Sequence, residues 1–231
     1  MIISFPFAGG NKYSFQIFSK NLSHFNIVEY PGRGMRINEK LVFDVDLLID
    51  DLLHKVKDGI MFCEDYIIYG HSMGSLMGYL VCQKIEELGL PKPIKLVVSG
   101  RKPPSIKREK LISHLPDNLF WEEVVKMGGI PDELLNHHEL IDFYTPILKA
   151  DFTAIEKYIY VKKDKLTIPI DVFYGSDEEI TEEEIKGWEE ETIGKVTITE
   201  LEGNHFFIFS NEDFFINYFN NLTKSLNLST N

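Results

Sequence analysis

Short apolar runs alternate along the chain with longer segments in which apolar residues recur every three or four positions. The short runs predict β-strands at 2–5, 26–30, 66–69, 95–99, 170–174 and 195–201. The periodic segments predict helices at 14–22, 45–57, 76–88 and 214–226, and an acidic helix that ends near Trp188. In the helix at 45–57, the predicted buried face carries Leu47, Leu48, Leu52 and Val56, and Gly59 is the expected stop. This alternation is typical of the α/β class, a mainly parallel sheet with helices on both faces.

The alternation stops between Pro103 and about Asp151. Helical periodicity continues there without strands and is punctuated by prolines and by Gly128-Gly129, which predicts an insertion of several short helices. We find no internal repeat and no long linker. We therefore expect a single domain over residues 1–231, with a helical insertion at about 103–151.

The sequence Gly70-His71-Ser72-Met73-Gly74 lies between the strand predicted at 66–69 and the helix predicted at 76–88. In this context Gly-x-Ser-x-Gly forms a nucleophile elbow, a strained turn that exposes the serine hydroxyl at the end of a strand. The flanking glycines remove Cβ atoms that would clash in so tight a turn. We predict that Ser72 is the nucleophile. The alternative is a serine that only caps the helix.

A serine nucleophile needs a general base, and in folds with this elbow the base is a histidine after the last strand. Of the seven histidines, only His205 has that position, so we assign it as the base; the alternative is a buried structural histidine. We expect His71 to point away from the base position. The remaining histidines lie in helical or insertion segments: His24, His54, His114, His137 and His138.

The acid that orients the histidine should follow the strand at 170–174, which ends in Gly175-Ser176-Asp177. The glycine permits a sharp turn after which Asp177 can reach the histidine, and we choose Asp177. Glu178 and Glu179 stand beside it and could take its place, whereas Asp171 lies inside the strand and should point elsewhere. The alternative for Asp177 is a cap of the acidic helix.

The oxyanion that forms during acyl transfer needs two backbone N–H donors. One is expected from Met73, the residue after the nucleophile, and the other from a loop that follows an early strand. That loop is Phe5-Pro6-Phe7-Ala8-Gly9-Gly10, whose glycines let the backbone approach a substrate closely. We place the second donor at Ala8, with Phe7 as the weaker alternative.

Composition narrows the class of protein. A formal net charge of −12 disfavours nucleic acid, which binds basic surfaces. No apolar run approaches the length of a membrane span and no signal peptide is recognisable, so we expect a soluble cytoplasmic protein. Cys63 and Cys82 form no Cys-x-x-Cys pair and are expected to be buried apolar side chains. The serine mechanism requires no metal or redox cofactor.

Five motifs span nearly the whole chain: Phe5-Pro6-Phe7-Ala8-Gly9-Gly10, Tyr30-Pro31-Gly32-Arg33-Gly34, Gly70-His71-Ser72-Met73-Gly74, Leu148-Lys149-Ala150-Asp151-Phe152 and Gly203-Asn204-His205-Phe206-Phe207. Together they resemble the type II thioesterases of nonribosomal peptide and polyketide synthesis, which have the α/β-hydrolase fold. The resemblance implies a substrate in which an acyl group is carried as a thioester on the phosphopantetheine arm of a carrier protein. It also implies a role in editing or product release. We expect a monomer.

Two positions depart from the family pattern: Lys149 stands where arginine is usual, and Asn204 where glycine usually precedes the histidine. Arg33 is expected to anchor a turn rather than to act in catalysis. By analogy with the family, the insertion at 103–151 is a lid. Its large apolar residues either line an acyl pocket or, as we slightly prefer, form the helices' own core-facing stripe: Phe120, Trp121, Met127, Leu134, Leu135, Ile141 and Phe143.

The basic segment at 101–110 leaves the end of a strand where sheets of this class keep their active sites. We expect Lys107, Arg108 and Lys110 to dock an acidic carrier protein, with a solvated turn as the alternative. The acidic segment at 177–191 is expected to be a solvated surface. Two other functions stay open at this point: an esterase or lipase acting on free esters, and a noncatalytic hydrolase-fold binding protein.

Overall fold

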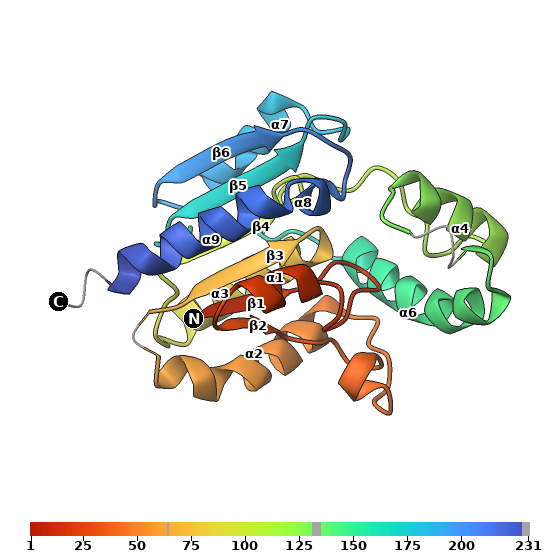
Figure 1. Ribbon diagram of the computed structural model, residues 1–231, viewed down its shortest axis with the longest axis horizontal. Coiled ribbons are helices and arrows are strands. Elements are labelled where there is room, and N and C mark those ends of the chain that lie inside the picture. Colours follow the sequence, from red (N-terminus) through yellow and green to blue (C-terminus); the bar gives the residue numbers. More distant parts are fainter. Residues whose placement is uncertain (64, 131–134, 228–231) are drawn as a thin grey trace.

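The computed structural model describes residues 1–63, 65–130 and 135–227. In this part of the chain a parallel sheet has the strand order β2-β1-β3-β4-β5-β6 (Figure 1). The strands are β1 (Ile2–Phe5), β2 (Phe25–Ile27), β3 (Ile67–His71), β4 (Lys95–Ser99), β5 (Ile170–Gly175) and β6 (Val196–Leu201). The predicted α/β class is confirmed. The second strand is shorter than predicted, because Val28, Glu29 and Tyr30 already belong to the loop that follows it.

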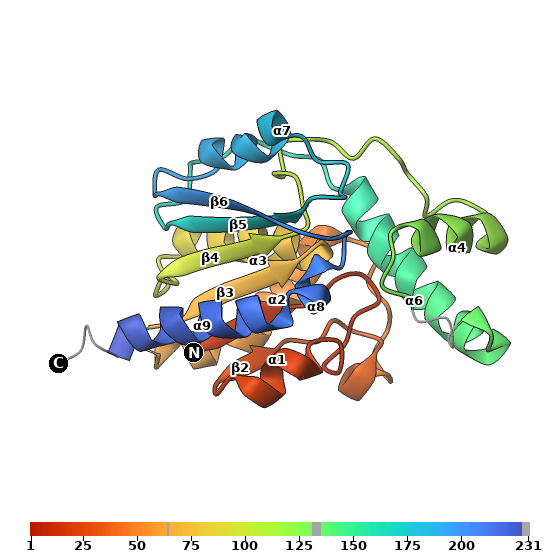
Figure 2. The same cartoon turned by 45° about the horizontal axis from the view of Figure 1, so that its top comes forward.

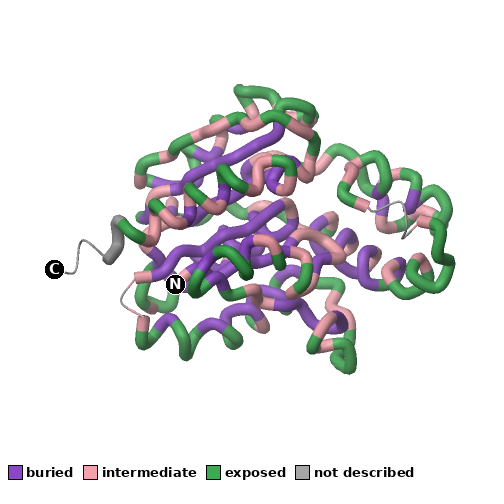
Figure 3. The backbone as a smooth tube through the Cα atoms, viewed as in Figure 1, coloured by how far each residue is buried: buried purple, intermediate pink, exposed green. Residues whose placement is uncertain are grey.

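Helices cover both faces of the sheet (Figure 2). One face carries α1 (Gln16–Asn21) and α9 (Glu212–Asn227), and the other carries α2 (Val45–Met61) and α3 (Met73–Glu87). Alternate strand residues supply the two cores: Ile68 packs with the α2 and α3 side, whereas Ile67 and Tyr69 pack with the α1 and α9 side. The buried strands form the centre of the molecule in Figure 3.

The helix α2 differs from its prediction at two points. It continues through Gly59 to Met61, because a Cβ-free residue on an open helix surface weakens a helix without ending it. Leu47 was expected on the buried face, yet 61% of it is exposed. The stripe that packs against the sheet side includes Leu48, Leu52 and Val56, as predicted.

The insertion contains α4 (Asp117–Lys126) and α6 (His138–Lys157), which project beyond the sheet (Figure 1). The helix α6 runs past the predicted boundary at Asp151, because its C-terminal half buries Phe152 and Ile155 in the main core. The insertion and the core therefore share one continuous helix. Shorter helices complete the described chain: η1 (Gly34–Arg36), α7 (Glu182–Lys186), η2 (Gly187–Glu190) and α8 (Phe207–Ser210).

The two insertion helices pack on each other. The rings of Phe120 and Phe152 lie 5.7 Å apart, and the indole N–H of Trp121 donates to Thr145 at 2.7 Å. For Phe120 and Trp121 the core-facing interpretation is confirmed, since both are buried. The other members of the predicted set divide: Met127, Leu135 and Ile141 are partly buried, Phe143 is 46% exposed, and Leu134 lies outside the described residues.

The order of the strands places a crevice beside β1. From β1 the chain moves outward to β2, and it then returns to β3 on the other side of β1. Loops that leave the carboxyl ends of β1 and β3 consequently run in opposite directions. The space between two such loops is the usual position of a ligand site in an open α/β sheet. None of the described helices combines the length and apolarity needed to cross a lipid bilayer.

Candidate active site

Ser72 occupies a strained turn between β3 and α3. Its φ is 56° and its ψ is −113°, a conformation that side-chain-bearing residues rarely adopt. A Cβ atom on Gly70 would lie 2.0 Å from the carbonyl oxygen of Gly74, and one on Gly74 would lie 1.9 Å from that of Phe5. Both flanking positions therefore require glycine. The turn has the geometry of the predicted nucleophile elbow.

His205 reaches Ser72 from the loop after β6. Its Nε2 lies 2.9 Å from Ser72 Oγ, within hydrogen-bond distance, although 133 residues separate the two in sequence. The side chain of His205 is 22% exposed, so part of the imidazole is accessible to solvent. The structure thus brings together the nucleophile and base expected from the sequence.

The acid beside His205 is Glu178, and the choice of Asp177 is wrong in this structure. Glu178 Oε1 lies 2.6 Å from His205 Nδ1, and its other oxygen accepts from the N–H of Gly175 at 2.8 Å. The Glu178 side chain is only 6% exposed. Asp177 is exposed on the surface, where its carboxylate accepts from the hydroxyl of Ser176 at 3.1 Å.

A tight turn at the end of β5 explains the difference. The N–H of Glu178 donates to the carbonyl of Gly175 at 3.1 Å, so Glu178 is the last residue of a four-residue turn and faces back toward the sheet. Asp177, one position earlier, has its N–H tied to the carbonyl of Gly203 at 3.0 Å and its side chain directed outward. Both acids lie in the predicted loop, and only the turn geometry selects between them.

His71 lies against the catalytic histidine, contrary to the expectation that it points away. The rings of His71 and His205 are 5.1 Å apart, and His71 Nδ1 lies 2.9 Å from the hydroxyl of Ser99. Complete burial, together with the neighbouring His205, holds the pKa of His71 well below its usual value. His71 is therefore neutral at physiological pH and adds no charge beside His205.

The loop after β1 presents its backbone to the elbow. The N–H of Gly10 donates to the carbonyl of Phe7 at 2.9 Å, and Gly9 has a φ of 75°, which together define a type II turn with Ala8 and Gly9 at its centre. The N–H groups of Ala8 and Met73 have no hydrogen-bond acceptor among the described residues. These are the two donors that the sequence predicts for an oxyanion, and that role stays a prediction.

The insertion touches the histidine loop. Gly128 and Gly129, which follow α4, have positive φ values of 81° and 74°. A Cβ on Gly128 would lie 3.0 Å from the amide nitrogen of Asn204, and one on Gly129 would lie 2.3 Å from the ring of Phe206. The side chain of Asn204, at the position where the family usually has glycine, therefore fills space beneath the lid.

The three predicted docking residues do not form one exposed patch. Lys107 is exposed, whereas the guanidinium of Arg108 lies 5.2 Å over the ring of Phe152 and its Nε donates to the carbonyl of Lys110. The ammonium group of Lys110 pairs with Glu123. Arg108 is thus directed into the insertion rather than toward a partner.

Lys149 links the two insertion helices. Its ammonium group donates to the carbonyl of Leu115 at 2.9 Å and pairs with the carboxylate of Asp117 at 2.5 Å. The lysine found in place of the usual arginine therefore still binds two acceptors, one bond to each.

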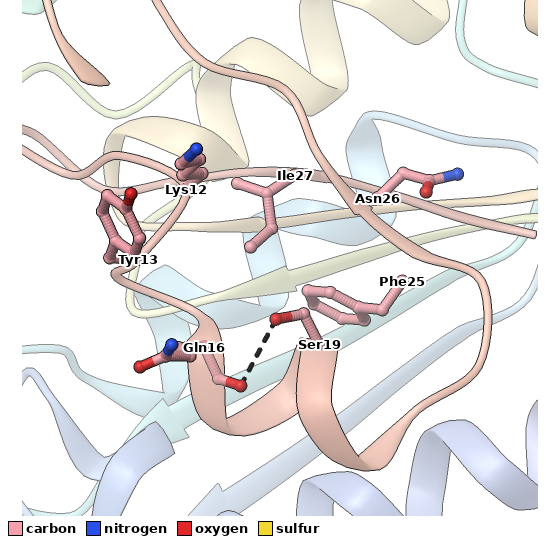
Figure 4. Close-up of a pocket in the computed structure, with 7 residues that line it drawn as sticks. All are labelled: Lys12, Tyr13, Gln16, Ser19, Phe25, Asn26 and Ile27. Carbon is pink, nitrogen blue, oxygen red and sulfur yellow. Dashed lines mark hydrogen bonds between the residues drawn. The ribbon is translucent and has the colours of Figure 1, made fainter. Parts of the chain in front are cut away.

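Two surface pockets lie away from the serine. One, of about 350 Å³, is bounded by Lys12, Tyr13 and Gln16 together with residues of β2 (Figure 4). The other, of about 500 Å³, is lined by residues at the start of α6, including His137 and Leu140. Neither pocket includes a member of the Ser72, His205 and Glu178 set. No group of three or more potential metal-ligating side chains gathers among the described residues.

A parallel sheet with a nucleophile elbow, followed along the chain by a buried carboxylate and then by a histidine, defines a serine hydrolase of the α/β-hydrolase fold. Within that class, the model of the thioesterase domain family matches residues 1–222. The chain belongs to the thioesterase family.

Individual relatives agree with the family match. A protein of Vibrio anguillarum named as a probable anguibactin biosynthesis thioesterase, AngT, is 33% identical over 88% of this chain and 83% of its own length. The crystal structure of ClbQ from the colibactin pathway covers 99% of this chain and 98% of its own, with 30% identity and a TM-score of 0.90. The type II thioesterase BorB from the borrelidin cluster matches with 27% identity and a TM-score of 0.86, over 95% and 91% of the two chains.

Proposed function

We propose that the protein hydrolyses acyl thioesters carried on the phosphopantetheine arm of a carrier protein. The observation that carries the chemistry is the hydrogen-bonded line from Ser72 through His205 to Glu178, at 2.9 and 2.6 Å. The choice of substrate is supported by the relatives, since ClbQ comes from a nonribosomal peptide and polyketide pathway and AngT from anguibactin biosynthesis. The proposed role is editing or product release in such a pathway.

In the proposed acylation step, Ser72 Oγ attacks the thioester carbonyl while His205 Nε2 accepts the hydroxyl proton. Glu178 holds the imidazole through Nδ1 and stabilises the imidazolium that forms. The negative charge that develops on the carbonyl oxygen is met by the N–H groups of Met73 and Ala8. Collapse of the tetrahedral intermediate breaks the C–S bond and leaves the acyl group on Ser72.

The leaving thiol has an ordinary pKa near 8.5. It can therefore depart as a thiolate with little acid assistance. The proton on His205 then passes to the thiolate or to solvent, and His205 becomes a base again. It takes a proton from water, the resulting hydroxide attacks the acyl-Ser72 ester, and the carboxylic acid product leaves. The proton returns to Ser72 Oγ, so the enzyme is unchanged after one turnover.

The carrier protein is the proposed partner, and Lys107 is the residue of the basic segment that is best placed to meet it. Lys107 and Lys110 are both exposed, but Lys110 is paired with Glu123, and Arg108 lies over the ring of Phe152. An exposed cation contributes mainly to the rate of encounter between two acidic proteins. The monomeric state and the cytoplasmic location stay predictions.

A panel of acylated carrier proteins tests the proposed function. We expect wild-type protein to release the acyl groups and Ser72→Ala to release none, with free thiol measured for each substrate. The same acyl group is also offered as a free alkyl ester. A preference for the free ester over every carrier-bound thioester would assign the protein to the esterases instead. Failure of a serine-directed phosphonate to label Ser72 would indicate a noncatalytic binding protein.

A further inference from the structure

A buried ion pair joins two motifs that the mechanism leaves unused. Arg33, in the loop after β2, donates through Nη2 to Asp151 Oδ1 at 2.6 Å and through Nη1 to the other carboxylate oxygen. The two side chains are 3% and 0% exposed. From the sequence we expected Arg33 to anchor a turn, which concerns only one of the two residues in this contact. Asp151, in the middle of α6, is the other end.

Asp151 also holds the loop that carries Ala8. Its Oδ2 accepts a hydrogen bond from the N–H of Gly9 at 2.7 Å. On the other side of the same loop, the hydroxyl of Tyr30 donates to the carbonyl of Pro6 at 2.8 Å, and the guanidinium of Arg33 lies 5.2 Å over the Tyr30 ring. Tyr30, Arg33 and Asp151 form what we call the loop clamp, which grips the backbone on both sides of Ala8.

The clamp acts on the peptide that decides the turn type. In a type II turn the peptide between the two central residues, here Ala8 and Gly9, is rotated by about half a turn relative to its orientation in a type I turn. Because Gly9 has no Cβ, its own backbone accepts either orientation. The hydrogen bond from its N–H to a carboxylate favours the orientation observed, since a charged acceptor forms a stronger bond than a neutral one.

We propose that Asp151, itself oriented by Arg33, is a positioning residue for the oxyanion hole. By anchoring the N–H of Gly9, it fixes the Ala8–Gly9 peptide and excludes the arrangement in which the Ala8 carbonyl turns toward the loop clamp. Ala8 is thereby held in the position from which its own N–H, in the preceding peptide, reaches the oxyanion. This inference rests on the proposed function only in so far as Ser72 forms an acyl-enzyme. It holds for any acyl substrate.

The cost of the ion pair supports a role beyond stability. Burying two charges carries a desolvation penalty, and well-packed apolar residues in place of a buried pair often leave a protein equally stable. Burial lowers the pKa of Arg33, but Asp151 together with Tyr30 and Glu29 outweighs burial and raises that pKa above its usual value. Arg33 therefore stays charged, and the carboxylate that it binds accepts from one backbone N–H of the oxyanion loop.

Two double variants separate the proposed role from simple packing. Arg33→Met with Asp151→Leu removes both charges and leaves the N–H of Gly9 without an acceptor. Arg33→Met with Asp151→Asn also removes both charges, but the amide oxygen of the asparagine can still accept from Gly9. Each is assayed on a small acyl thioester of N-acetylcysteamine, so that carrier docking has no influence on the result.

We expect the leucine variant to lose about 10- to 100-fold in kcat with KM little changed, because a misplaced oxyanion donor is less damaging than the 100- to 1000-fold effect of losing one outright. Its affinity for an alkyl boronic acid, which forms a tetrahedral adduct on Ser72, should fall by a similar factor. The asparagine variant should recover most of both losses. Equal kcat values in the two variants would overturn the proposal.

A buried acid elsewhere supplies the control. Asp171 accepts from Lys95 at 2.7 Å and from Tyr218 at 2.6 Å, on the opposite side of the sheet from the loop clamp. Asp171→Asn should lower the melting temperature and leave kcat and boronate affinity unchanged. If the double variants fail to fold, Arg33→Lys tests the same point, since a loss of kcat without a change in KM is still required. A wild type active on the small thioester but inert toward carriers would refute the proposed function alone.

Discussion

Replacing Glu178 by glutamine tests the assignment of the acid most directly. The change conserves size and removes the negative charge 2.6 Å from His205 Nδ1. In wild type this charge stabilises the imidazolium that forms as Ser72 attacks. In the variant the amide has no charge to offer, and its N–H₂ group competes to donate to Nδ1, which favours the wrong tautomer of the base.

The magnitude follows from the burial of the pair. The side chain of Glu178 is 6% exposed and that of His205 is 22% exposed, so the pair is largely but not fully shielded from solvent. Two unit charges whose centres lie about 4 Å apart interact by about 4 kcal/mol at an effective dielectric constant of about 20. At about 1.4 kcal/mol per tenfold change in rate, the loss corresponds to about a thousandfold fall in kcat. KM should change little.

The assay compares Glu178→Gln with Asp177→Asn, a matched neutralisation one residue away. Thiol release from an acyl thioester gives kcat and KM, and circular dichroism verifies that both variants are folded. We expect Asp177→Asn to stay within twofold of wild type, because that carboxylate is exposed and touches only Ser176. A large loss in Asp177→Asn, with Glu178→Gln nearly normal, would refute the reasoning and restore the acid chosen from the sequence.

Two further predictions concern stability. Ser72→Gly should be more stable than Ser72→Ala by about 1 kcal/mol in urea unfolding, because only glycine relieves the strain of a φ of 56°; equal midpoints would argue against stored strain. His71 is neutral when folded but takes up a proton when unfolded below its ordinary pKa of about 6.5, so protonation favours the unfolded state and stability is lost as pH falls. Relative to His71→Gln, wild type should lose up to about 1.4 kcal/mol per pH unit below pH 6, and parallel pH curves for the two proteins would contradict this.

The sequence was most informative where backbone geometry leaves a single choice of residue. Glycine is required at 70 and 74 because an added Cβ would lie about 2 Å from neighbouring backbone, and the pattern of these glycines located Ser72. His205 could be found because chain order left one histidine after the last strand. Both inferences depend on constraints that can be recognised from the order of residues in the sequence.

The errors have a different physical origin. Asp177 and Glu178 lie in one loop and carry the same charge. The choice between them depends on a turn closed by the carbonyl of Gly175, and neither composition nor periodicity reveals that turn. Leu47 matches the helical period of α2 yet lies outside the contact surface, because the width of the buried stripe depends on what packs against it. The helix α6 also continues past Asp151 to Lys157 without a break, so no sequence signal marks where the insertion ends.

The contrast between the floor and the roof of the site has a consequence for redesign. The floor is made of backbone, since the elbow at Gly74 rests directly on the carbonyl of Phe5, and any larger residue there displaces the nucleophile. On the opposite side the site meets side chains, since Gly128 and Gly129 of the insertion lie against Asn204 and Phe206 of the histidine loop. An engineer who seeks altered acyl selectivity should therefore place libraries at these side-chain contacts and keep the scaffold beneath them as it is.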